Sequence, residues 1–205
     1  MNRIEVHTGG AFQTNAYAFP TPSGKQLLID APAGVVEWVK RRGWEVAALM
    51  LTHAHLDHVE EAAALCQAFD CPVYYHVDGA RFLQDRDAFR RYGLDVDLEP
   101  VTGGILIDET DSVEIGGVTW RSLLVPGHCP GSLCFFREEE RVLFAGDTIF
   151  AGSIGRTDIP FGDHELLLRG IREKLFPLGD DVRVLPGHGP GTTIGQERIS
   201  NPYLS

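Results

Sequence analysis

Three histidines and an aspartate occur within six consecutive residues, 53–58, directly after the apolar run 46–52. In an extended segment, side chains two residues apart point the same way, so His53, His55 and Asp57 can project together. A helix that begins near Asp57 would turn His58 toward the same centre. Burying these imidazoles without partners would cost roughly 1 to 3 kcal/mol for each ring. The segment is therefore expected to end a strand and to bind metal, and its donors suit zinc, iron or manganese.

Short apolar runs with β character alternate with helix-like segments along the chain, and the runs end at glycine, proline or polar clusters. The predicted strands are 26–30, 46–52, 71–77, 118–126, 132–137, 141–147 and 181–188. The predicted helices are 33–43, 58–69, 78–93 and 163–178. This alternation favours a mixed α/β fold. No low-complexity segment, linker or short repeat is evident, so residues 1–205 are predicted to form a single domain.

Side chains that can bind metal or support a ligand follow five of the predicted strands. They are Asp30, His53, His128, Asp147 and His188. Loops at the carboxyl ends of strands are the usual place for ligand sites in α/β proteins, because the sheet holds the loop bases rigidly. The five residues are therefore expected to contribute to one site.

Composition narrows the classes of partner. An apolar content of 43% in 205 residues is ample for a buried core, whereas a net charge of -11 disfavours binding to nucleic acid. The first residues, MNRIEVHTGG, lack the apolar core of a signal peptide, and no run approaches a membrane span. A soluble, cytoplasmic protein without a membrane partner is expected.

The four cysteines, Cys66, Cys71, Cys129 and Cys134, show no CxxC spacing and are expected to be structural thiols. Cys129 directly follows His128, so it is the cysteine expected nearest to the candidate ligands.

The order of four motifs resembles the metallo-β-lactamase superfamily. The motifs are THAHLDH at 52–58, PGH at 126–128, GD at 146–147 and PGH at 186–188, and they extend over most of the chain. The resemblance implies an α/β fold of the four-layer αββα type, in which two mixed β-sheets are flanked by helices and the metals lie at one edge.

The same resemblance implies a cofactor of two divalent metal ions, with zinc first and iron or manganese as alternatives. The implied ligands are His53, His55 and His128 for one ion, Asp57, His58 and His188 for the other, and Asp147 as the bridge between them. Asp30 matches a family carboxylate that hydrogen-bonds a ligand imidazole and thereby fixes its tautomer.

Two branches of the superfamily fit these residues. Asp147 argues against a true β-lactamase, and His55 argues against the flavodiiron proteins, which resemble this pattern with a glutamate there. The branches that remain are glyoxalase II, which hydrolyses thioesters such as S-lactoylglutathione, and persulfide dioxygenase, whose single iron is held by residues matching His53, His128 and Asp147. The tail at 185–204, with TTIGQER and NPYL, resembles the short glyoxalase II-like hydrolases of bacteria. The helical glutathione-binding domain of full-length glyoxalase II is not expected in this chain, so the thiol carrier stays open.

The function predicted from this resemblance is hydrolysis of a small-molecule thioester. A hydroxide held by the metals would attack the carbonyl carbon, and Asp57 would orient it or receive its proton. Arg156 is expected to bind a substrate carboxylate, because a guanidinium binds carboxylate in a fork. A monomer or a small homo-oligomer is expected. Two alternatives belong to other functional classes: a metal-dependent oxygenase, and a metal-binding domain without catalytic turnover. The complete set of seven ligands disfavours the domain without turnover.

Overall fold

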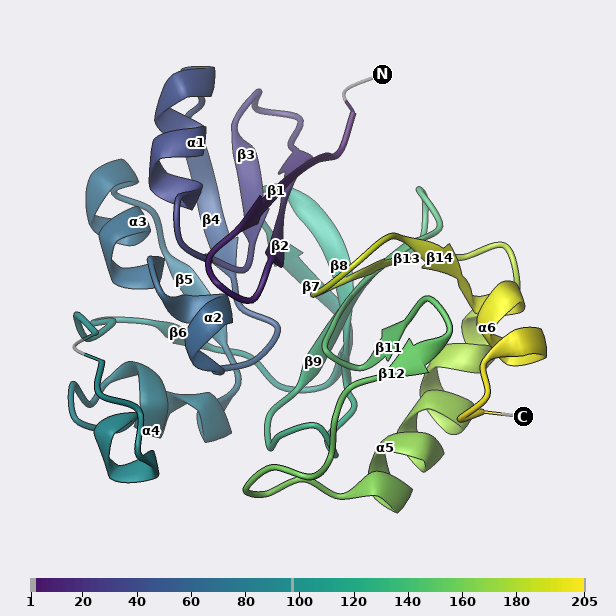
Figure 1. Cartoon of the computed structure of the whole chain (residues 1–205). Coiled ribbons are helices and arrows are strands. Elements are labelled where there is room, and N and C mark those ends of the chain that lie inside the picture. Colours follow the sequence, from purple (N-terminus) through teal and green to yellow (C-terminus); the bar gives the residue numbers. More distant parts are fainter. Residues whose placement is uncertain (1–2, 97, 205) are drawn as a thin grey trace. The chain divides into compact units, whose positions relative to one another are not determined.

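The computed structural model describes residues 3–96 and 98–204 (Figure 1). The chain divides into two compact units. The N-terminal unit comprises Met1–Ile107 and Glu114–Val118, and the C-terminal unit comprises Asp108–Val113 and Thr119–Ser205. Each unit is built around its own six-stranded sheet and its own cluster of buried apolar side chains.

The N-terminal sheet is mixed and follows the chain order. Its strands are β1 (Glu5–Gly9), β2 (Thr14–Pro20), β3 (Gln26–Ile29), β4 (Val46–Met50), β5 (Val73–Tyr75) and β6 (Ile105–Leu106). The first three strands pair antiparallel, and β3 to β6 pair parallel. Because β3, β4 and β5 are parallel neighbours, the loops that leave them emerge at the same edge of the sheet.

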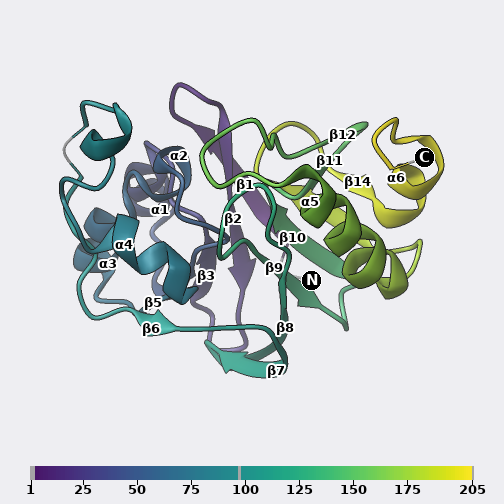
Figure 2. The same cartoon turned by 90° about the horizontal axis from the view of Figure 1, so that it is seen from below.

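Four α-helices belong to the described part of the N-terminal unit. They are α1 (Val35–Arg42), α2 (Leu56–Val59), α3 (Ala62–Phe69) and α4 (Ala80–Leu83), with 3-10 turns at Val77–Gly79 and Arg90–Tyr92. Figures 1 and 2 show α1 and α3 side by side along the parallel part of the sheet. The fully buried Leu28, Leu49 and Leu65 belong to the core of this unit. Each such side chain contributes about 1.5 to 3 kcal/mol on burial.

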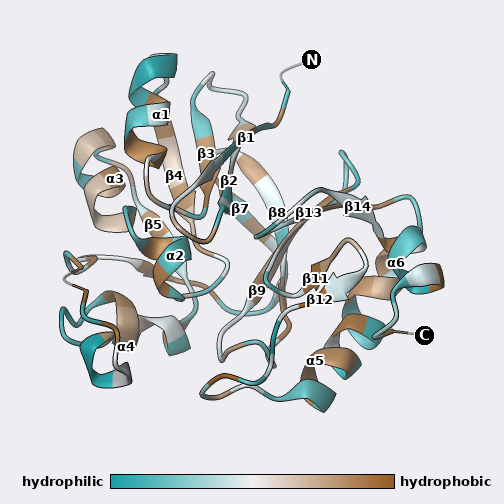
Figure 3. Ribbon diagram, in the orientation of Figure 1, coloured by the Kyte–Doolittle hydropathy of each residue, from teal (hydrophilic) through white to brown (hydrophobic). Residues whose placement is uncertain are grey.

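Helix α1 illustrates how the sequence specifies an element here. Val35, Trp38 and Val39 are buried at the spacing of one helical face. The carboxylate of Glu61 accepts hydrogen bonds from the backbone N–H groups of Gly34 and Val36, both at 2.9 Å. It therefore caps amino-terminal donors that the helix itself leaves without partners. In Figure 3, α1 carries both hydrophobic and hydrophilic stretches, as a helix that covers a sheet requires.

The C-terminal sheet is also mixed. Its strands, in spatial order, are β14 (Thr192–Thr193), β13 (Arg183–Pro186), β10 (Val142–Gly146), β9 (Leu133–Arg137), β8 (Val118–Leu124) and β7 (Thr110–Ile115). A two-stranded hairpin of β11 (Ile149–Phe150) and β12 (Ser153–Ile154) follows β10. Helix α5 (His164–Gly170) continues into a π-helical turn (Ile171–Leu175) and a 3-10 turn (Phe176–Leu178), and α6 (Ile194–Ser200) comes last.

Two mixed sheets with accompanying helices confirm the predicted fold class. All seven predicted strands are found, although they are shorter at their ends. Helix 33–43 is confirmed as α1, whereas 58–69 is divided into α2 and α3. Within residues 3–96 and 98–204, no helix has the length and apolar character needed to cross a membrane.

The prediction of one continuous helix over 78–93 is wrong. The structure has only α4 and two 3-10 turns there. The carboxylate of Asp85 accepts a hydrogen bond from the backbone N–H of Asp87 at 3.0 Å, which gives the backbone a local alternative to the helical hydrogen bond. The predicted helix 163–178 also changes its winding after Gly170, before Pro177 in the terminal 3-10 turn.

Candidate metal centre

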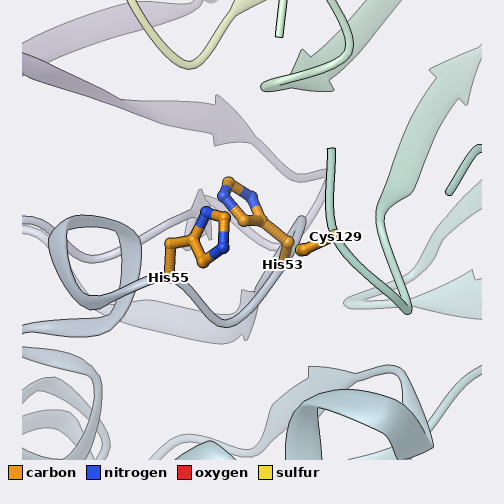
Figure 4. Close-up of side chains that lie close together, drawn as sticks. All are labelled: His53, His55 and Cys129. Carbon is orange, nitrogen blue, oxygen red and sulfur yellow. The ribbon is translucent and has the colours of Figure 1, made fainter. Parts of the chain in front are cut away.

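The histidine motif follows β4 in the N-terminal unit, as predicted. His53 and His58 are buried, and His55 is half-buried. The ring centroids of His53 and His55 are 4.7 Å apart, and those of His53 and His58 are 4.1 Å apart. Figure 4 shows the first two rings beside each other on the loop that leaves the sheet. The loop thus groups three imidazoles at one point.

Asp30, directly after β3, is linked by hydrogen bonds to two of these rings, directly to His58 and through Thr52 to His53. Its Oδ1 accepts a hydrogen bond from the backbone N–H of Thr52 at 2.8 Å, and its Oδ2 accepts one from the Thr52 hydroxyl at 2.8 Å. The same Oδ2 lies 2.8 Å from Nδ1 of His58. Asp30 is 2% exposed, so its carboxylate is almost completely shielded from solvent. The prediction that Asp30 hydrogen-bonds a histidine of the motif is confirmed, and the carboxylate is the acceptor.

These contacts determine which ring nitrogens carry a proton. A carboxylate only accepts, so Nδ1 of His58 must be the donor. The Thr52 hydroxyl donates its one hydrogen to Asp30. In its 3.0 Å contact with Nδ1 of His53 the hydroxyl can therefore only accept, so Nδ1 of His53 is the donor. In the neutral imidazoles, Nε2 of both rings therefore bears a lone pair that can bind a metal.

Asp57 lies in the first turn of α2 and is held by a residue of β2. The hydroxyl of Thr14, a fully buried residue, donates to Oδ2 of Asp57 at 2.6 Å. This oxygen also lies 3.5 Å from Nε2 of His58. Thr14 was not predicted, because nothing in the local sequence signals that β2 passes beside Asp57. Thr52 immediately precedes the histidines, and its position is the only signal that could have identified it.

In the C-terminal unit, the other three predicted ligands each follow a strand of the same sheet. Strand β8 pairs antiparallel with β9, which pairs antiparallel with β10, and β10 pairs parallel with β13. Strands β8, β10 and β13 therefore run in one direction, and their carboxyl ends share an edge. His128, Asp147 and His188 follow these ends. Oδ2 of Asp147 lies 3.3 Å from Nε2 of His188 and 3.6 Å from Nε2 of His128.

The tautomer of His128 is also fixed. Its Nδ1 lies 2.8 Å from the backbone carbonyl of Arg156, and because a carbonyl only accepts, Nδ1 carries the proton. The Nε2 lone pair of neutral His128 therefore faces the Asp147 carboxylate, which is also an electron-pair donor. Such an arrangement is stabilised by a cation between the donors or by a proton on the ring.

The donor chemistry in both units fits a divalent metal. Imidazole Nε2 atoms with fixed tautomers and carboxylate oxygens are the ligands that zinc, iron and manganese accept. The seven predicted ligands divide between the units as His53, His55, Asp57 and His58 in the first and His128, Asp147 and His188 in the second.

Two glycines explain how the C-terminal loops reach these positions. A Cβ atom on Gly155 would lie 1.9 Å from the carbonyl oxygen of Asp147, so only glycine lets the chain after β12 pass this close. Gly127 has φ +128°, and a Cβ there would lie 2.5 Å from the backbone nitrogen of Leu167 in α5. The PGH motif at 126–128 thus packs tightly on the helix while presenting His128.

The guanidinium of Arg156 is engaged by a neighbour. Its Nε and one terminal nitrogen donate to the two carboxylate oxygens of Asp158 at 2.9 and 3.0 Å. This fork raises the pKa of Arg156 and lowers the pKa of Asp158, in each case chiefly through the hydrogen bonds between the two side chains. Both side chains are exposed, so the pair is open to exchange with another carboxylate. Binding of a substrate by Arg156 stays a prediction.

Cys129 is buried, and its Sγ lies 3.4 Å from the hydroxyl of Ser132. All four cysteines are free thiols, as expected.

The tail contributes a buried carboxylate that sequence reasoning missed. Glu197 of α6 accepts hydrogen bonds from Gly152 of the β11–β12 hairpin and from the side chain of Asn201, both at 2.8 Å. The tail thereby anchors the hairpin that follows Asp147.

Comparison with known proteins agrees with this geometry. The chain is 38% identical to the hydroxyacylglutathione hydrolase GloC of Haemophilus influenzae over 98% of each chain. The crystal structure of the B3 metallo-β-lactamase BLEG-1 has a TM-score of 0.90 and 37% identity, covering 99% of this chain and 100% of that one. The structure of TTHA1623 in a di-iron-bound form has a TM-score of 0.84 and 36% identity, covering 98% and 100%.

A family model described as the metallo-β-lactamase superfamily matches residues 9–188, which include all seven predicted ligands. The chain therefore belongs to the metallo-β-lactamase superfamily.

Proposed function

We propose that this protein is a metal-dependent thioester hydrolase that acts on S-lactoylglutathione or a related hydroxyacyl thioester. The observation that carries the proposal is the 38% identity, over 98% of both chains, to a hydroxyacylglutathione hydrolase. The fixed histidine tautomers in each unit support the metal dependence, because in the neutral ring they leave the Nε2 lone pair available to a metal.

In this proposal, the seven ligands of the two units together hold two divalent ions. His53, His55 and His128 would hold the first, Asp57, His58 and His188 would hold the second, and Asp147 would be shared by both. Zinc is the first choice, and iron is supported by the di-iron form of TTHA1623, which is 36% identical to this chain.

When bound, the two ions supply a hydroxide nucleophile near neutral pH by lowering the pKa of coordinated water. Residues of the chain then position the groups that take part in the reaction. Thr14 donates to Oδ2 of Asp57 at 2.6 Å and so restricts the rotation of the carboxylate that orients the nucleophile or takes its proton. In thioester hydrolysis the carbonyl carbon would gain this hydroxyl group, the carbon–sulfur bond would break, and the sulfur would leave as a thiolate. Because a thiol has a pKa near 8.5, the thiolate leaves without a strong general acid.

Arg156 is proposed to bind a carboxylate of the substrate, in place of the fork with Asp158. We expect Arg156→Ala to raise KM by about tenfold while leaving kcat and metal content close to wild type, because uniform binding is lost without loss of transition-state stabilisation. Steady-state kinetics with metal analysis of the same samples measure this. Arg169→Ala, which removes an exposed arginine of α5, is the matched control and should change neither parameter. An unchanged KM in Arg156→Ala would refute the assignment.

Hydrolysis of a β-lactam is a second candidate activity, because the B3 metallo-β-lactamase BLEG-1 is 37% identical to this chain over nearly its whole length. Both candidates need a hydrolytic nucleophile and differ in the bond that is cleaved. The bridging aspartate argued on sequence grounds against a true β-lactamase, and a direct assay decides between the two.

The first experiment measures the loss of S-lactoylglutathione, other acyl thioesters and a chromogenic cephalosporin by the purified, metal-assayed protein in anaerobic buffer. We expect turnover of the hydroxyacyl thioester to exceed that of the cephalosporin by at least about a hundredfold in kcat/KM. The zinc-loaded and iron-loaded proteins should both be active. Faster turnover of the cephalosporin would replace the proposal with β-lactam hydrolysis. Failure with every thioester, together with oxygen-dependent consumption of glutathione persulfide by the iron form, would replace it with the dioxygenase.

A further inference from the structure

Two cysteines meet at the carboxyl end of α3, in the N-terminal unit. The helix ends at Phe69, and Asp70 adopts the left-handed conformation with φ 47°. The backbone N–H of Asp70 donates to the carbonyl of Cys66, and the N–H of Cys71 donates to the same carbonyl at 3.3 Å. The second of these bonds, from the sixth residue back to the first, is the hydrogen bond that characterises a Schellman closure.

This closure brings particular side chains together. In a Schellman motif, the residue after the left-handed position contacts the residue that provides the carbonyl, and apolar side chains usually occupy both places. Here both are cysteines. Standard bond lengths and a 3.3 Å hydrogen bond limit the separation of the two Cα atoms to about 7.5 Å, and the bends between these bonds shorten this distance. A disulfide spans Cα separations of about 4.4 to 6.8 Å.

The two thiols differ in their surroundings. Cys66 is half-buried and Cys71 is buried. Donation by the Cys71 thiol lowers the pKa of Cys66, and the same bond together with burial raises the pKa of Cys71. The thiol with the lowered pKa, Cys66, is therefore the more accessible of the two.

We propose that Cys66 and Cys71 form a redox-active dithiol that exchanges with low-molecular-weight disulfides to give an intramolecular disulfide at the end of α3. The Cys66 thiolate attacks one sulfur of the external disulfide, which releases one thiolate and leaves a mixed disulfide on Cys66. The Cys71 thiol then loses its proton to solvent and attacks the Cys66 sulfur, which releases the second thiolate. Two protein thiols are oxidised, and one disulfide is reduced to two thiols.

The second step is not blocked by the raised pKa of Cys71. The largest cause of that rise is the hydrogen bond to Cys66, and it disappears once Cys66 has become a disulfide. Only the desolvation and the nearby Asp70 still oppose ionisation. The Schellman closure keeps the backbones of the two cysteines close, and the attack is intramolecular.

The other two cysteines serve as internal controls. Cys129 and Cys134 are both buried in the C-terminal unit, and burial raises the pKa of Cys134 to about 12. A thiol of this kind does not supply the thiolate that disulfide exchange needs. We expect both to remain reduced when Cys66 and Cys71 react.

The test incubates the full-length native protein with excess glutathione disulfide, blocks the remaining thiols with iodoacetamide in denaturant, and maps the products by mass spectrometry. We expect a loss of about 2 Da, from two thiol hydrogens, and a cross-linked peptide that contains Cys66 and Cys71. Dithiothreitol should reverse the change. Cys71→Ser should stop at a mixed glutathione disulfide on Cys66, whereas Cys66→Ser should leave Cys71 alkylatable. Circular dichroism confirms that both variants are folded.

Two results would overturn the proposal. One is a wild-type protein that accumulates the mixed disulfide on Cys66 and never forms the cross-linked peptide. The other is a wild-type protein whose Cys66 reacts no faster than Cys134. These outcomes do not depend on any catalytic assay, so they are separate from the fate of the proposed hydrolase.

Discussion

Replacement of Asp147 by Ala should remove most of the bound metal and lower thioester turnover by more than about a hundredfold. Oδ2 of Asp147 lies 3.3 Å from Nε2 of His188 and 3.6 Å from Nε2 of His128, so one carboxylate oxygen lies near the Nε2 atoms of two imidazoles. Without it, Asp57 would be the one carboxylate left among the proposed ligands to balance the charge of two divalent ions. The loss should therefore exceed that of a single terminal ligand.

Metal content by inductively coupled plasma mass spectrometry and turnover of S-lactoylglutathione, measured on the same samples, test this expectation. Asp111→Ala is the matched control, because it removes a solvent-exposed aspartate of the same unit. A protein with Asp147→Ala that kept both its metal and its turnover would show that the bridging assignment is wrong. A folded variant that lost only one of two ions would instead place Asp147 on a single metal.

The sequence allowed the ligand positions to be predicted because each follows a strongly apolar strand. Met50 and Gly146 end buried strands, and the residues just beyond them have to leave the sheet, so the ends of these apolar runs indicated where His53 and Asp147 lie. The same reasoning missed β1 and β2. Strand β1 has only half-buried and exposed residues, and β2 contains Thr14 and Asn15, which interrupt the apolar signal although both are buried.

Supporting contacts were less predictable than ligands because they depend on distant parts of the chain. The hydroxyl of Thr14 reaches Asp57 over 43 positions, and the carboxylate of Glu61 caps α1 over 27 and 25 positions. Asp30 was predicted because it ends a strand and matches a family position, but its link through Thr52 to a second histidine appears only in the structure. Helix α6 could have been predicted, since Thr193 followed by Gln196 is a capping pattern, and the Thr193 hydroxyl does accept from the N–H of Gln196 at 3.1 Å.

Replacement of Asp30 by Asn should change the tautomer of His58 and weaken metal binding by about 10- to 100-fold. Both oxygens of Asp30 accept hydrogen bonds, and asparagine can replace only one of them as an acceptor. If the amide nitrogen takes the place of Oδ1, two donors oppose each other at the backbone N–H of Thr52. If it takes the place of Oδ2, it donates to Nδ1 of His58, and the ring proton moves to Nε2.

The second orientation avoids the opposed donors and is the one we expect. It removes the lone pair on Nε2 that the proposed ligand role requires, while the Thr52 hydroxyl can rotate to accept from the amide. The substitution should not strain the backbone at position 30. Asp30 has φ 62°, and asparagine tolerates this left-handed conformation as well as aspartate does. The loss of a buried, charged hydrogen-bond acceptor should also lower the free energy of unfolding by about 3 kcal/mol.

Nitrogen-15 NMR of the histidine rings in the metal-free protein reports the tautomer directly, and competition with a chromogenic chelator reports metal affinity. Asp78→Asn is the matched control, because Asp78 also faces a histidine, with its Oδ2 3.4 Å from Nδ1 of His76, but that histidine is not among the proposed ligands. This control should leave both the tautomer of His58 and the metal affinity unchanged. If Asp30→Asn kept the Nδ1 proton on His58 and lost affinity all the same, the carboxylate would act through its negative charge and not through the position of the ring proton.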